Sequence, residues 1–116
     1  MRSLAVVLAL LASAAGAGAH ALLVEAVPAD SARLAAAPPQ LVLRFNSRIE
    51  HKLSRAILIQ PGSRQPLALD AGAPPDRLVA ALPALAPGTY TVEWQVLSVD
   101  GHRVAGTLLF TIVGDG

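Results

Sequence analysis

Apolar and polar residues alternate with a period of two along much of the chain, most clearly over Thr89–Val99 and Gln40–Asn46. Because successive side chains of an extended backbone point to opposite sides, both segments are predicted to be half-buried strands. Their inward faces would consist of Tyr90, Val92, Trp94 and Val96 in the first segment and of Leu41, Leu43 and Phe45 in the second.

Five shorter segments complete the predicted strands, with Pro and Gly residues marking turns between them. They are Leu22–Val27, Ala56–Gln60, Gln65–Leu69, Leu78–Leu82 and a last strand whose inner face is Gly106, Leu108, Phe110 and Ile112. Ser31–Ala37 is expected to form one turn at most. Seven short strands with mostly antiparallel neighbours predict an all-β fold, a seven-stranded Greek-key β-sandwich of immunoglobulin-like type.

Two aromatic residues of the longest predicted strand have assignable roles. Trp94 is predicted to lie in the core rather than to form a stacking platform for a ligand, because its neighbours at two-residue spacing are apolar. Tyr90, which follows Pro87-Gly88, is either a plain core aromatic or a corner tyrosine, the residue whose hydroxyl bonds to the backbone in many such sandwiches.

The first 19 residues have the composition of a removable export signal. One arginine is followed by the apolar segment Leu4–Leu11, and Ala17–Ala19 has the small residues after which signal peptidases cut. An uncleaved membrane anchor is the alternative, but the second half is rich in Ala, Gly and Ser, and a spanning helix needs about 20 predominantly apolar residues. We therefore expect a signal peptide at residues 1–19 and a single domain at 20–116, beginning with His20.

Charge and sulfur content narrow the functional classes. Without the signal the chain would carry eight basic and eight acidic residues and no cluster of Lys and Arg, so nucleic acid is not expected as a partner. Cysteine is absent, and the only methionine is Met1, which would leave with the signal. Thiolate sites and thioether sites for Cu(I) are therefore excluded from the exported chain.

Two features carry candidate metal chemistry. His20 would become an N-terminal histidine, whose α-amine and Nδ1 can close one six-membered chelate ring around a cation. Asp100-Gly101-His102 offers a carboxylate and an imidazole two residues apart, on one side of an extended chain. Asp-Gly is also a strong hairpin signal, so the tripeptide taken alone favours a turn. Together with a terminal histidine on an exported chain, it favours a metal site.

The donor set indicates which metal is bound. One amine, two imidazoles and one carboxylate form a site of nitrogen and oxygen without sulfur, which suits tetragonal Cu(II) or Ni(II), with Cu(II) favoured by the general order of affinities. Zinc also binds His and Asp, but a terminal amine contributes nothing special to a tetrahedral site. The donors of His20, Asp100 and His102 thus favour Cu(II), with Ni(II) and zinc as alternatives.

Motifs spread over nearly all of residues 20–116 resemble the CopC family of periplasmic copper-binding proteins. They are His20-Ala21, Pro28-Ala29-Asp30-Ser31, Leu43-Arg44-Phe45, the run from Pro87 to Trp94, Ser98-Val99-Asp100-Gly101-His102, and Gly106 before Phe110. The resemblance implies a CopC-type domain, a seven-stranded Greek-key β-barrel or sandwich of cupredoxin-like topology. It implies that this domain binds one Cu(II) through the amine and imidazole of His20 together with Asp100 and His102. It also implies a periplasmic location and a membrane importer of the CopD type as a partner, and we expect a monomer.

The chain departs from the family pattern in two places. The methionine-rich loop with which some members bind Cu(I) is absent. Many members also read Phe-Ser-Glu where this chain reads Phe45-Asn46-Ser47, so a glutamate that supports the site in those members is missing. His51, among charged residues, is predicted to lie in a solvated loop rather than to contact copper, and Glu25 is predicted to be a surface carboxylate on the first strand.

Three functions of different classes remain open. The first is a non-enzymatic carrier or buffer of Cu(II) that contributes to copper homeostasis or resistance. The second is a small copper monooxygenase, since polysaccharide-oxidising enzymes also begin with histidine, although that class needs a flat aromatic surface and this chain has only two Phe, one Tyr and one Trp. The third is an immunoglobulin-like structural domain without metal.

Overall fold

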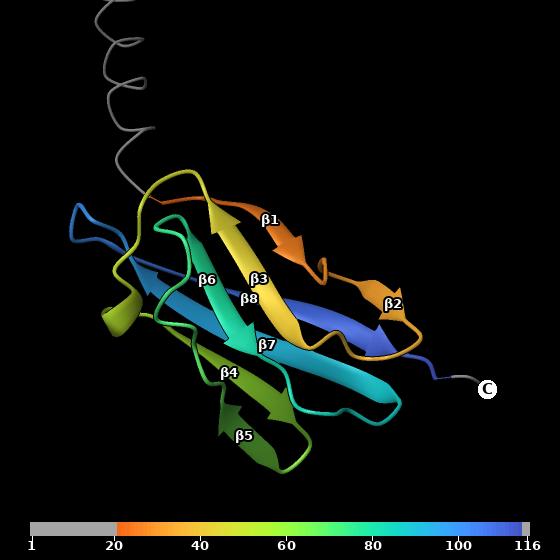
Figure 1. Cartoon of the computed structure of the whole chain (residues 1–116). Helices are drawn as coiled ribbons and strands as arrows, with labels where there is room; N and C mark the ends of the chain where they lie inside the picture. Colours follow the sequence, from red (N-terminus) through yellow and green to blue (C-terminus); the bar gives the residue numbers. More distant parts are fainter. Residues whose placement is uncertain (1–20, 115–116) are drawn as a thin grey trace, which may run out of the picture.

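Two β-sheets packed face to face make up the described part of the protein (Figure 1). The computed structural model describes residues 21–114. The first sheet has the order β1–β3–β6, with bounds Leu23–Val27, Gln40–Phe45 and Arg77–Ala81. The second has the order β2–β8–β7–β4–β5, with bounds Ala32–Leu34, Arg103–Ile112, Gly88–Leu97, Arg55–Gln60 and Ser63–Pro66. One 3₁₀ turn, η1 (His51–Leu53), precedes β4.

The pairing of the strands agrees with the predicted fold class. All neighbouring strands are antiparallel except β2 and β8, which run parallel. The all-β sandwich predicted from the alternating pattern is therefore confirmed. Within residues 21–114, no helix has the length and apolar character needed to cross a membrane.

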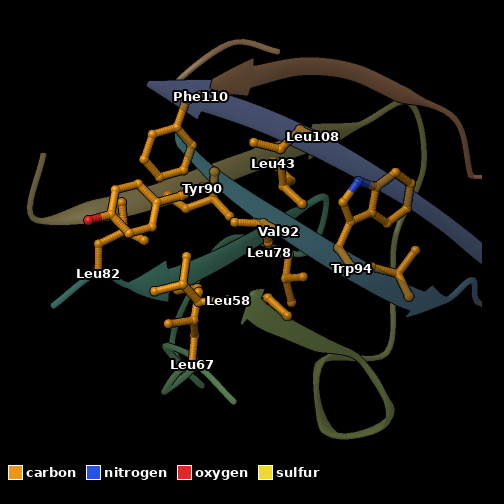
Figure 2. Close-up of a cluster of buried hydrophobic side chains, with 14 of the residues drawn as sticks. Leu43, Leu58, Leu67, Leu78, Leu82, Tyr90, Val92, Trp94, Leu108 and Phe110 are labelled. Carbon is orange, nitrogen blue, oxygen red and sulfur yellow. The ribbon is translucent and has the colours of Figure 1, made fainter. Parts of the chain in front are cut away.

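The core lies between the two sheets and is formed by the apolar faces of the alternating strands (Figure 2). Every inward residue predicted for the two clearest strands is buried, namely Leu41, Leu43 and Phe45 of β3 and Tyr90, Val92, Trp94 and Val96 of β7. Burying a side chain of this size contributes about 1.5–3 kcal/mol relative to its exposure. A shift of one residue in register would expose the whole set, so the pattern fixes which face of each sheet points inward.

The aromatic side chains all belong to this core. Trp94 is 6% exposed and packs edge-on against Phe45, with ring centroids 5.4 Å apart, which confirms its predicted core role. Tyr90 stacks on Phe110 and donates its hydroxyl proton to the carbonyl oxygen of Ala86 at 2.6 Å. It is therefore both a core aromatic and a corner tyrosine.

An eighth strand, β2, lies where the sequence suggested one turn at most. Its residues pair in parallel with the end of β8, in the register Ala32 to Phe110 and Leu34 to Ile112. The carboxylate of Asp30 supports this pairing by accepting the backbone N–H of Leu109 at 2.8 Å. Three residues are too few for an alternating pattern, and the strand forms because β8 offers it a free edge.

β5 is also displaced from its prediction. The sequence pattern predicts a strand over Gln65–Leu69, whereas β5 ends at Pro66. A two-residue turn lets Ser63 pair directly with Gln60, and the chain then crosses to the other sheet, where Leu69 forms a bridge with Ala80 of β6. The apolar residues that suggested a longer strand therefore serve the crossing between sheets.

Candidate metal centre

The tripeptide Asp100-Gly101-His102 forms the turn that joins β7 to β8. The backbone N–H of Ser98 donates to the carbonyl of His102 at 2.9 Å, and the N–H of Gly101 donates to the carbonyl of Ser98 at 3.0 Å. Gly101 has a φ of +89°, a conformation that L side chains rarely adopt, so glycine suits this position. The turn predicted from Asp-Gly is thus present, and the two flanking side chains meet because of it.

The Asp100 carboxylate and the His102 imidazole are in direct contact. Nδ1 of His102 lies 3.1 Å from Oδ2 of Asp100, while the backbone N–H of His102 donates to Oδ1 at 3.1 Å. The His102 side chain is 58% exposed and that of Asp100 is 32% exposed, so both remain accessible to an ion from solution. A carboxylate and an imidazole held together at an exposed turn are suitable donors for a divalent cation.

Ser98 orients the Asp100 carboxylate. Its side chain is almost fully buried, at 2% exposure, and its hydroxyl donates to Oδ1 of Asp100. This hydrogen bond, with smaller contributions from the backbone and side chain of His102, outweighs desolvation and lowers the pKa of Asp100 from 3.8 to about 2. The carboxylate is therefore ionised at neutral pH and needs to lose no proton to bind a metal ion.

The third predicted ligand, His20, lies outside the described residues. Its chain neighbour Ala21 is fully buried in the core, and Leu22 follows immediately before β1. Among residues 21–114, no group of three or more His, Cys, Asp or Glu side chains is arranged to hold a metal ion. In this part of the chain, the predicted site is represented by Asp100 and His102.

The segment between β3 and η1 connects the start of β1 to the turn that carries these two residues. Asn46 bonds to Leu22 in both directions, with Oδ1 accepting its N–H at 2.7 Å and the Asn46 N–H donating to its carbonyl at 2.9 Å. Ile49 forms a bridge with Ser98, and the carbonyl of Arg48 accepts the N–H of Val99 at 3.3 Å. Consequently the start of β1 and the β7–β8 turn lie at the same end of the sandwich (Figure 1).

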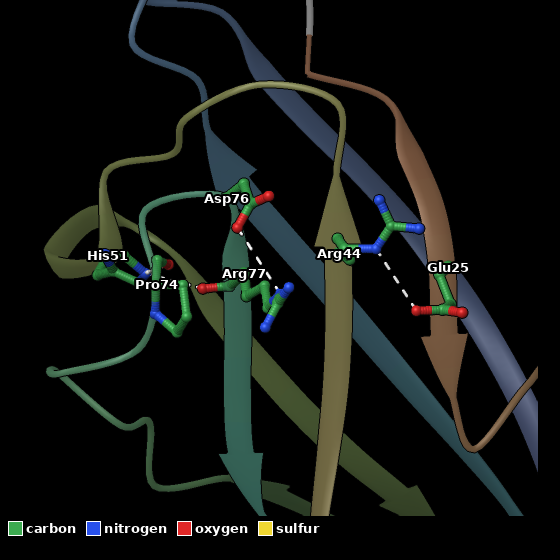
Figure 3. A network of polar contacts seen from close by, with 6 residues as sticks. All are labelled: Glu25, Arg44, His51, Pro74, Asp76 and Arg77. Carbon is green, nitrogen blue, oxygen red and sulfur yellow. Dashed lines mark hydrogen bonds and ion pairs between the residues drawn. The ribbon is translucent and has the colours of Figure 1, made fainter.

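His51 has a structural role that its sequence context concealed. Its Nε2 lies 3.1 Å from the carbonyl oxygen of Pro74 and 2.8 Å from that of Arg77 (Figure 3). Because carbonyl oxygens only accept, Nε2 carries the proton, and the ring ties η1 to the loop before β6 and to the start of β6. The prediction of a solvated loop is therefore wrong for this side chain.

Glu25 is a surface carboxylate, as predicted. It lies on β1 with its side chain 59% exposed, and Oε1 is 3.4 Å from Nε of Arg44 on the neighbouring strand (Figure 3). An exposed pair of this kind contributes about 0–1 kcal/mol.

Sequence reasoning assigned no role to Ser98 or Asn46, although both contact the candidate site or the chain leading to it. For Ser98, a signal was available: a serine two residues before an aspartate can bond to its carboxylate when the chain turns. For Asn46, no local pattern points to Leu22, because 24 residues separate the two in sequence.

Comparison with known proteins identifies close matches in sequence. The family model for the CopC domain matches residues 23–113. Protein YobA of Escherichia coli (strain K12) is 36% identical over 98 residues, which cover 81% of this chain and 79% of that protein. Copper resistance protein C of Pseudomonas syringae pv. tomato is 32% identical over 103 residues, covering 81% of each chain.

Solved structures match as well. The crystal structure of CopC from Methylosinus trichosporium OB3b has a TM-score of 0.75 and 32% sequence identity, and the match covers 84% of this chain and 97% of that one. PcoC, a methionine-rich copper resistance protein from Escherichia coli, has a TM-score of 0.65 and 32% identity, with coverage of 80% and 98%. The matches therefore extend over almost the whole length of both solved chains.

Proposed function

The chain belongs to the CopC family, as its motifs implied, and on this premise we propose that it is a periplasmic Cu(II)-binding protein that carries or buffers copper in copper homeostasis or resistance. Residues 1–19 act as the signal peptide, and the domain of residues 20–116 begins with His20 after cleavage. One Cu(II) is held by the amine and imidazole of His20, the carboxylate of Asp100 and the imidazole of His102.

The observation that carries this proposal is the contact between Asp100 and His102 at the end of the sandwich where the described chain begins. Nδ1 of His102 and Oδ2 of Asp100 are 3.1 Å apart. The segment from Asn46 to Ile49 bonds at one end to Leu22 and at the other to Ser98, at the base of the β7–β8 turn. The described residues at this end, Ala21 and Leu22, directly follow His20 in the sequence, which supports His20 as the third ligand.

The available donors favour Cu(II) over Cu(I). Cu(I) prefers soft thiolate and thioether ligands, and this chain has no cysteine and a single methionine, Met1. The related PcoC is described as methionine rich. We therefore propose a site for Cu(II) alone, with nitrogen and oxygen donors, and no counterpart of a methionine-based site.

Electron paramagnetic resonance of the chain starting at His20, loaded with one equivalent of Cu(II), tests the proposal. The expected spectrum is that of a single tetragonal Cu(II) with nitrogen and oxygen ligands, and it should disappear as acid protonates the donors. Protons compete with the metal for the amine and imidazole nitrogens, so the spectrum of unbound Cu(II) should replace that of the site as the pH falls. A spectrum of unbound Cu(II) at neutral pH would contradict the proposal.

A copper monooxygenase is a weaker candidate for the same donors. All four aromatic side chains, Phe45, Tyr90, Trp94 and Phe110, are buried in the core, so none provides a flat surface on which a polysaccharide could stack. A carboxylate ligand would also occupy a position that oxygen requires. We therefore propose a carrier without enzymatic activity, and turnover with a reductant and oxygen would contradict this choice.

The partners follow from the role of carrier. We propose that the protein is a monomer and that a separate membrane importer of the CopD type receives its copper. A purely structural immunoglobulin-like domain would need neither partner nor metal, and a copper titration distinguishes the two: saturation at one equivalent of Cu(II) supports the carrier, and no binding supports the structural domain.

A further inference from the structure

Asn46 continues the pairing of β1 and β3 beyond the end of the strand. β3 ends at Phe45, which pairs with Leu23. One residue further on, the backbone N–H of Asn46 donates to the carbonyl of Leu22 at 2.9 Å, and its side-chain Oδ1 accepts the Leu22 N–H at 2.7 Å. Two residues that exchange both bonds form the closely bonded pair of an antiparallel ladder, and here a side chain replaces one of the backbone acceptors.

The two hydrogen bonds to Asn46 hold the backbone of Leu22, and packing of the Leu22 side chain does not. The side chain of Leu22 is 50% exposed, so its position is not required by the core. Its neighbour Ala21, in contrast, is fully buried. The chain is therefore fixed at two successive residues, by packing at Ala21 and by Asn46 at Leu22, and His20 is the next residue toward the terminus.

The segment that contains Asn46 also contacts the turn that carries Asp100 and His102. Three residues after Asn46, Ile49 is 4% exposed and bridges Ser98, the residue whose hydroxyl binds the Asp100 carboxylate. The segment thus bonds at one end to Leu22 and at the other to the base of the β7–β8 turn. A single short connection sets the spacing between the two parts of the chain.

We propose that Asn46 is a positioning residue for copper, holding the N-terminal segment at a fixed place relative to Asp100 and His102; this inference rests on the proposed function. Donors on separate segments bind an ion more tightly when the protein has already ordered them, because less conformational entropy is lost on binding. Removing Oδ1 frees the Leu22 N–H and loosens the segment while leaving every copper ligand in place.

The test compares Asn46→Ala with Asn46→Asp, which keeps an acceptor oxygen, in chains starting at His20. Asn46→Ala should bind Cu(II) about three- to tenfold more weakly, the range expected for one lost hydrogen bond. Hydrogen exchange at the Leu22 amide should accelerate by a similar factor in the metal-free protein. Asn46→Asp should restore slow exchange and bind Cu(II) at least as tightly as the unmodified chain does. Ser47→Ala, which removes a side chain with no hydrogen bond among the described residues, should match the unmodified protein in both measurements.

A version with one added Gly before His20 shows whether Asn46 acts through the terminus. In that background the terminal chelate is broken and this segment offers at most the His20 imidazole, so Asn46→Ala should cause a smaller further loss of affinity. Equal Cu(II) affinity for Asn46→Ala and the unmodified chain would overturn the positioning role while leaving the proposed function intact. An unmodified chain that binds no Cu(II) would overturn both. Loss of affinity of equal size with and without the added Gly would also overturn the positioning role, since the effect would not pass through the terminus.

Discussion

The buried hydroxyl of Ser98 donates a hydrogen bond to the carboxylate of Asp100, two residues along the turn between β7 and β8. One oxygen of Asp100 accepts this bond and the N–H of His102, while the other faces the His102 ring at 3.1 Å. A residue of the core therefore determines how an exposed pair of candidate ligands is presented. Support of this kind commonly affects metal affinity by about 10–100-fold.

We predict that Ser98→Ala raises the pKa of Asp100 from about 2 toward 3.8, because it removes the largest cause of the lowered value. A carboxyl group whose pKa is lower in the folded state than in the unfolded state stabilises the fold at pH values above its unfolded-state pKa. That stability is lost as the pH falls from about 4 through 2. Ser98→Ala should weaken this acid dependence. Carbon-13 NMR titration of the metal-free protein measures the pKa, and an unchanged midpoint would contradict the assigned cause.

Replacement of the candidate ligands should weaken binding in a fixed order. His102→Ala removes a nitrogen donor and should lower Cu(II) affinity by more than about 100-fold. This exceeds the loss expected when a residue that only supports a ligand is replaced. Asp100→Asn keeps the size and one oxygen acceptor, so about tenfold is expected. Chelator competition measures both. Thermal melting is the control, because His102 is 58% exposed and its loss should leave the fold intact. Unchanged Cu(II) affinity of His102→Ala would show that Asp100-Gly101-His102 is a turn without a role in copper binding.

The difference between predicted and observed structure has a physical cause. β3, β7 and β8 were predictable because long alternation commits one face of each strand to the core. The contact between Asp100 and His102 was predictable because residues two apart are close in either a strand or a turn. β2 and the Asn46 contact were not predictable, because both depend on a partner brought near only by folding.

Gly106→Ala should destabilise the protein without affecting copper. A Cβ atom at this position would lie 2.5 Å from Cζ2 of Trp94, whose side chain is 6% exposed and packs against Phe45. Overpacking of this kind costs about 1–3 kcal/mol. Urea unfolding measures the cost, and Gly72→Ala is the matched control, since its nearest contact would be an ordinary 3.4 Å. Equal stability of both variants would show that the Trp94 ring has room to shift.

His51→Ala separates a structural role from a copper contact. Removing the Nε2 proton leaves the carbonyls of Pro74 and Arg77 without this donor, and about 1 kcal/mol of unfolding free energy should be lost. Cu(II) affinity should stay unchanged. The neighbouring Lys52→Ala, which is exposed, controls for a general effect of altering η1. Weaker copper binding with unchanged stability would instead make His51 an auxiliary ligand.

The strongest dependence should be on the first residue of the exported chain. In the proposed site, the amine and Nδ1 of His20 form one chelate only when His20 is the terminus, because in a longer chain that nitrogen is an amide, which binds copper only by losing a proton. One Gly added before His20 should therefore lower Cu(II) affinity by at least about tenfold, or 1.4 kcal/mol, and remove a nitrogen signature from the resonance spectrum.

Mass spectrometry of the exported protein first establishes where the signal is cut. Matched titrations of the native terminus and the extended chain then measure the effect, with thermal melting to show that both fold alike. Ala21 is fully buried and Leu22 is hydrogen-bonded to Asn46, and both contacts should survive the addition of Gly. Equal affinity for the two chains would mean that the amine is not a ligand, and would leave the His20 imidazole as the only donor from this segment beside Asp100 and His102.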